Sequence, residues 1–186
     1  NYLVNIADGK NICQFNETNY SGHSHVDNGS IVLYFKKIPI FIDSGRYSYY
    51  WKNKRDYYRS PMAHSTFVVD KGVGWHSNQL LLPTVDFIEK NNQFSHTCVR
   101  ASYSLLCLGL RFYRTIHIIK DTVVIISQVK FKGLHSLDSY WYLPFQCDAK
   151  ENEIRIPELN ESLYLHYNGK CILSDTEVYY HSNEES

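Results

Sequence analysis

Residues 22–30, with the sequence GHSHVDNGS, place two histidines and an aspartate at alternate positions, a spacing that suits proton transfer or metal binding. If this segment is extended, the period of two in a strand sends His23, His25 and Asp27 to the same face. Asp27 would then fix the tautomer of one imidazole, or it would instead support the Asp-Asn-Gly turn that follows. The segment therefore predicts a convergence of titratable groups.

Two further candidate ligands stand beside apolar runs. Asp43 follows the run IPIFI and opens an Asp-Ser-Gly step, which places a carboxylate at a strand end but is also typical of a turn. His64 comes just before the strand-like run TFVV. The set His25, Asp43 and His64 suits zinc with an open fourth position, whereas calcium would prefer more oxygen ligands. Because most histidines are simply hydrogen-bonded locally, spacing alone leaves metal binding and a structural role both open.

The elements that must position these residues are short runs of β-branched and aromatic residues, separated by the turn-forming residues Gly, Asn, Asp and Pro. The sequence has almost no helical periodicity. An Asn-Gly pair at 168–169 predicts a type I′ hairpin between two such runs. We expect an all-β fold, an antiparallel two-sheet β-sandwich forming one domain over residues 1–186. The predicted strands cover residues 2–6, 31–35, 39–42, 66–69, 97–106, 110–119, 122–131, 139–145, 162–167 and 170–174.

Composition narrows the class of protein. A chain of 186 residues with 44% hydrophobic residues can bury a full core. Lys and Arg number 19, as do Asp and Glu, so no net charge draws the chain to nucleic acid or anionic lipid. No apolar run approaches the roughly 20 residues of a membrane span. The five cysteines include no CxxC pair, which argues against a thiolate zinc ribbon, and the 16 tyrosines are better explained as core and strand-face residues than as sugar-stacking rings.

The order of the motifs carries a more specific signal. The segments GHSHVDNGSIVLYF, IPIFIDSGRYSY and RDYYRSPMAHSTFVVD follow one another in the sequence. Together they resemble the C-terminal domain of heparinase II/III-like polysaccharide lyases. The sequence departs from the family pattern at Ser44, Arg46 and Ser65, and these departures leave the candidate ligands intact.

The resemblance implies a set of roles. His23 would be the catalytic histidine facing a cleft, while His25, Asp43 and His64 would bind a structural divalent metal, taken as zinc. In this family an N-terminal helical toroid, absent from this chain, packs against the sandwich and supplies a tyrosine and an asparagine or histidine. We therefore expect the isolated domain to be inactive.

The implied reaction is β-elimination on a polysaccharide that contains uronic acid. An anionic polysaccharide substrate could be contacted by Arg46, Arg59 and Tyr47, which lie in or near the loop after Asp43. Neither nucleic acid nor a membrane span is expected, and a periplasmic or secreted setting is preferred. Two alternatives stay open: a non-catalytic, metal-stabilised carbohydrate-binding or scaffolding sandwich from a polysaccharide-assembly protein, and a cupin-like metal oxygenase.

Overall fold

A computed structural model describes residues 2–7, 12–17, 25–45, 47, 52–72, 84–93, 96–105, 108–119, 122–150, 153–156 and 161–164. The helical elements are α1 (Lys52–Arg59) and the short 3-10 turns η1 (Pro61–Ala63) and η2 (Asp70–Gly72). The strands are β1 (Tyr2–Ala7), β2 (Ile12–Glu17), β3 (Ile31–Phe35), β4 (Ile38–Phe41), β5 (Phe67–Val69), β6 (Thr84–Gln93), β7 (His96–Leu105), β8 (Leu110–Ile119), β9 (Thr122–Lys130), β10 (Leu137–Ser139), β11 (Asp148–Lys150), β12 (Glu153–Ile156) and β13 (Glu161–Tyr164).

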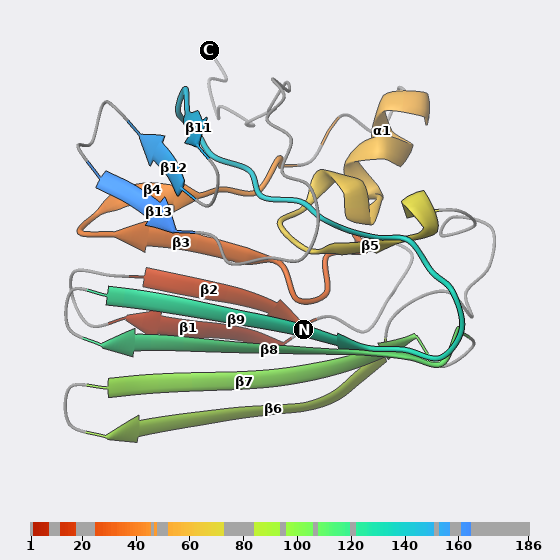
Figure 1. Ribbon diagram of the computed structural model, residues 1–186, viewed down its shortest axis with the longest axis horizontal. Coiled ribbons are helices and arrows are strands. Elements are labelled where there is room, and N and C mark those ends of the chain that lie inside the picture. Colours follow the sequence, from red (N-terminus) through yellow and green to blue (C-terminus); the bar gives the residue numbers. More distant parts are fainter. Residues whose placement is uncertain are drawn as a thin grey trace, which may run out of the picture.

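Two antiparallel four-stranded sheets form the body of the domain, one in the order β1-β2-β3-β4 and the other in the order β6-β7-β8-β9 (Figure 1). Each strand pairs with the next along the chain, as the short connections of a meander require. Lys36 and Lys37, with φ of 50° and 70°, form the turn between β3 and β4, so both take the positive φ of a type I′ turn without any glycine.

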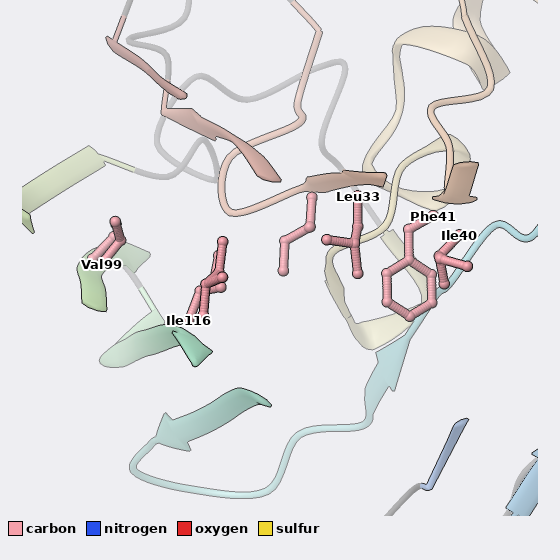
Figure 2. Close-up of a cluster of buried hydrophobic side chains, with 8 residues drawn as sticks. Leu33, Ile40, Phe41, Val99 and Ile116 are labelled. Carbon is pink, nitrogen blue, oxygen red and sulfur yellow. The ribbon is translucent and has the colours of Figure 1, made fainter. Parts of the chain in front are cut away.

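The core lies between these two sheets. Alternate residues of β8 are buried, as period-two patterning dictates for a strand with one face inward. Figure 2 shows Leu33, Ile40 and Phe41 from the first sheet in one cluster with Val99 and Ile116 from the second. Each of these side chains is less than 9% exposed, and burying one stabilises the fold by about 1.5–3 kcal/mol.

A smaller group of elements stands beside the sheets. The helix α1 leads into η1, which precedes β5, and β5 pairs with β10 in a separate two-stranded sheet (Figure 1). The short strands β11, β12 and β13 make a further antiparallel sheet. No helix among the described residues is long and apolar enough to cross a membrane.

The predicted fold class is confirmed, since the described chain is dominated by antiparallel strands. Strands 31–35 and 110–119 are confirmed with their bounds, and several other strands agree within a residue or two. Strands β2, β6, β11 and β12 and the helix α1 were not predicted. The predicted hairpin at residues 167–170 and the strand that follows it lie outside the described residues.

The predicted strand at 139–145 is wrong beyond Ser139. Its backbone bonds go to two separate segments, because Tyr140 N donates to Thr66 O at 3.0 Å and Ile42 N donates to Tyr142 O at 2.9 Å. A strand needs a continuous ladder with one neighbour, so these divided bonds leave the segment extended but irregular.

Candidate functional site

Three irregular segments bring the predicted ligands together. We call residues 25–30 the His25 loop and residues 64–66 the His64 loop; Asp43 follows the end of β4. His64 is fully buried, and its Nδ1 lies 2.7 Å from Asp43 Oδ2. The ring centroids of His25 and His64 are 5.2 Å apart with the planes tilted by 43°. The structure therefore unites residues separated by up to 39 positions in the sequence.

Asp43 and His64 form a mutually stabilising pair. Burial by itself raises the pKa of Asp43, but the hydrogen bond and positive charge of His64 outweigh it and hold that pKa below its ordinary value. Burial likewise lowers the pKa of His64, and the hydrogen bond and charge of Asp43, with a contribution from Asp27, raise it overall. The pair thus favours a carboxylate beside an imidazolium, so a metal would compete with a proton for the imidazole.

One nitrogen of this buried pair lacks a hydrogen bond of good geometry. His64 Nε2 is buried and makes no hydrogen bond of good geometry, although the backbone of Tyr58 interacts with the ring and helps to raise its pKa, while Asp43 Oδ1 accepts a bond from Gly45 N at 2.8 Å. A buried polar atom in this state calls for an explanation, and an ion bound there is one. Among the described residues, however, no group of His, Cys, Asp and Glu side chains has the arrangement of three or more metal ligands. Asp43 is therefore seen as the hydrogen-bond partner of His64, and its role as a ligand stays a prediction.

Hydrogen bonds from small polar side chains and backbone groups hold the segments in place. Ser44 Oγ donates to Ala63 O at 2.5 Å, which ties the chain after β4 to η1. Thr66 Oγ1 donates to Asn28 O at 2.6 Å and so links the His64 loop to the His25 loop. Val26 N donates to Arg59 O at 2.9 Å, which fastens the His25 loop to the end of α1. The sequence reasoning missed these hydroxyl residues, although their positions next to candidate ligands could have marked them.

Of the other four predicted site residues, the structure describes Tyr47 and Arg59. His23 and Arg46 lie outside the described residues. Tyr47 is half-buried and stacks on Tyr58 with ring centroids 5.6 Å apart, so its ring packs against α1. Arg59, at the end of α1, is half-buried and contacts the His25 loop through its backbone. The predicted alternation of the first motif does not apply to residues 25–30, which form a bend and a turn in place of a strand.

Comparison with known proteins places the chain in a family. Residues 12–176 match the family model described as heparinase II/III-like, C-terminal. The chain belongs to this family. The predicted resemblance is confirmed, and the match covers the candidate ligands and most of the sandwich. No curated protein matches the sequence.

Solved structures agree on the fold. The heparan sulfate lyase HepC from Pedobacter heparinus superimposes with a TM-score of 0.63 at 16% identity, and a mutant of it with 0.64 at 17%. A structure titled heparinase III, the BT4657 gene product, gives 0.60 at 16% identity and covers 82% of this chain. These matches span 77–82% of this heparinase II/III-like chain but only 23–24% of the solved chains. It therefore corresponds to about a quarter of the length of such proteins.

Proposed function

We propose that this chain is the sandwich part of a polysaccharide lyase that cleaves glycans containing uronic acid by β-elimination. The observation that carries the proposal is the family match over residues 12–176, together with the cluster of His25, Asp43 and His64 at one site. The similar structures are of a heparan sulfate lyase and a heparinase III, which belong to this chemical class.

We propose that a divalent metal, taken to be zinc, binds at His25, Asp43 and His64. Support comes from the donor chemistry of these residues and from the buried His64 Nε2, a nitrogen without a hydrogen bond of good geometry. His25 and His64 would hold the ion, and Asp43, by accepting the hydrogen bond from His64 Nδ1, would orient the His64 ring, as carboxylates commonly do for metal-binding histidines. Direct ligation by Asp43 would require this bond to break. The ion would supply a structural tie between the His25 loop and the His64 loop.

His23 is the residue that we assign to proton transfer, and it stands two positions before His25 in the sequence. In β-elimination a base takes the proton from C5 of the uronate, the bond from C4 to the glycosidic oxygen breaks, and an acid protonates that oxygen. A histidine with an ordinary pKa of about 6.5 is a competent base near neutral pH. Fixing the His25 loop would hold this imidazole at the short range that proton transfer requires.

An N-terminal toroid and an anionic polysaccharide are the proposed partners. The chain spans 23% of the length of HepC, so such a protein has ample chain for a further domain that completes the cleft. Of the residues proposed to meet the substrate, Arg46 and Arg59 carry the charge that would pair with carboxylate or sulfate groups. Tyr47 packs against Tyr58 and would contact substrate only along its remaining exposed edge.

The test is to express the complete protein, offer a panel of uronic acid polymers, and follow the ultraviolet absorbance of the conjugated unsaturated uronate. We expect product with the wild type and none with His23→Ala. His135→Ala is the matched control, because His135 pairs with Asp70 at 2.9 Å, outside the cluster, and should leave activity unchanged. Metal bound without any unsaturated product, across the panel, would favour the scaffolding alternative and refute the lyase assignment.

A further inference from the structure

Arg114 is a charged residue on the inner face of the sandwich. The alternate positions of β8 on that face are the buried side chains of Leu110, Phe112, Ile116 and Ile118, and Arg114 stands among them with 1% exposure. A charge in such a place is costly unless hydrogen bonds and neighbouring groups compensate for its lost hydration. Its contacts therefore indicate what the residue does.

The guanidinium of Arg114 lies close to two aromatic rings and is hydrogen-bonded to the neighbouring strand. Its Cζ lies 5.2 Å from the centroid of Phe67 and 5.0 Å from that of Trp141, within the range of cation–π attraction. Its Nε donates to Ser127 Oγ at 3.0 Å on the neighbouring strand β9. These contacts fix both the plane of the guanidinium and its rotation within that plane.

The distal end of the guanidinium reaches the loops of the candidate site. Arg114 Nη1 donates to Ser65 O at 3.0 Å and also to Gly29 O. Ser65 follows His64 directly, and Gly29 belongs to the His25 loop. A single nitrogen on a rigid strand thus binds the backbone of both loops that present the paired imidazoles.

We infer that Arg114 is a positioning residue that holds the His25 loop and the His64 loop at the separation where His25 and His64 face each other. The effect on metal binding rests on the proposed function, whereas the effect on the His64 ring does not. Lysine cannot replace this role, because an ammonium on a flexible stem lacks the planar fork that bonds Ser127 on one side and the two carbonyls on the other.

The rival account is that Arg114 only fills the core, and two readouts separate the accounts. The first is zinc affinity of the full chain, measured by competition with a chromophoric chelator. The second needs no metal: it is the NMR signal of the His64 Nδ1 proton, which the Asp43 hydrogen bond should shift downfield and protect from exchange. The variants are Arg114→Met and Arg114→Lys. Ile118→Ala is the matched control, since Ile118 is equally buried on the same face of β8.

We expect both Arg114 variants to weaken zinc binding by about tenfold or more, the usual effect of disturbing groups that orient ligands, and to lose the protected Nδ1 signal. Ile118→Ala should lower the unfolding temperature yet keep both readouts at wild-type levels. The inference is overturned if folded Arg114 variants match Ile118→Ala in both. Should Arg114→Met not fold, Arg114→Lys keeps the charge and carries the comparison. If the wild type binds no zinc while the Nδ1 signal still depends on Arg114, the positioning role stands and the metal proposal fails.

Discussion

Replacing Gly29 with alanine should destabilise the domain through two separate effects in the His25 loop. Gly29 has a φ of +74°, a left-handed conformation that costs residues other than glycine about 1–2 kcal/mol. A Cβ built at this position would lie 2.4 Å from both Cε1 and the hydroxyl oxygen of Tyr103. Relief of such overpacking in a core typically costs about 1–3 kcal/mol. The two effects together predict that Gly29→Ala lowers the free energy of unfolding by about 2–5 kcal/mol.

Tyr103 has little room to retreat from the new methyl group. It is 2% exposed, its ring stacks on Phe112 with centroids 4.9 Å apart, and its hydroxyl lies 3.3 Å from Thr66 Oγ1. A shift of the ring would therefore disturb the core on one side and the His64 loop on the other. For a chain of this size the midpoint of thermal unfolding should fall by about 10 °C, which circular dichroism can follow.

Gly109→Ala is the matched control for the backbone term. Gly109 also has a positive φ, +61°, but the nearest atom to its added Cβ is Lys132 Cβ at 3.8 Å, an ordinary contact. Gly109→Ala should therefore lower the free energy of unfolding by only about 1–2 kcal/mol. Combining Gly29→Ala with Tyr103→Leu should cost less than the sum of the single changes. Equal losses for the two glycine variants would refute the reasoning from the close approach.

Three other contacts in the structure each give a testable prediction. Asp43→Asn should weaken zinc binding by about 10–100-fold in a chelator competition, because the His64 ring loses its carboxylate partner. His117 should titrate below 6.5 by NMR, since burial first and then the charge of His96 lower its pKa, and His96→Gln should move it upward. With the folded pKa lowered, the unfolded chain binds this proton first on acidification, so stability should fall as the pH drops through 6.5. Tyr142→Phe should cost about 1–3 kcal/mol in urea unfolding, because Met62 O loses its donor.

The sequence was sufficient to predict the elements whose pattern is local. Strand β8 has its apolar side chains at alternate positions, and its bounds were predicted directly. The helix α1 was missed because its eight residues, KNKRDYYR, make only about two turns and include two adjacent aromatic residues, which is too short a run for a repeating apolar pattern to be recognised. Tyr58, in this helix, is only 4% exposed. Packing of its side chain against the rest of the protein therefore stabilises a helix that is too short to be stable by itself.

The candidate site also contains residues that the sequence predicts and one residue whose role it does not predict. His25, Asp43 and His64 were predicted from motif order, but their spacing along the chain gave no distance between them. The role of Arg114 could not be predicted, because a charged residue within an alternating strand normally faces solvent. Only the structure shows its guanidinium close to two aromatic rings and bonded to loop carbonyls.

Different kinds of hydrogen bond stabilise the sandwich and the loops of the candidate site. Strands β7 and β8 pair through a continuous ladder that runs from His96 opposite Ile119 to Leu105 opposite Leu110. The site loops have no such ladder and depend on isolated bonds from Ser44, Thr66 and Arg114. Loss of one bond in a ladder leaves its neighbours in place, whereas loss of one isolated bond frees a loop. Substitutions in this buried polar set should therefore alter the geometry around His25 and His64 well before they unfold the domain.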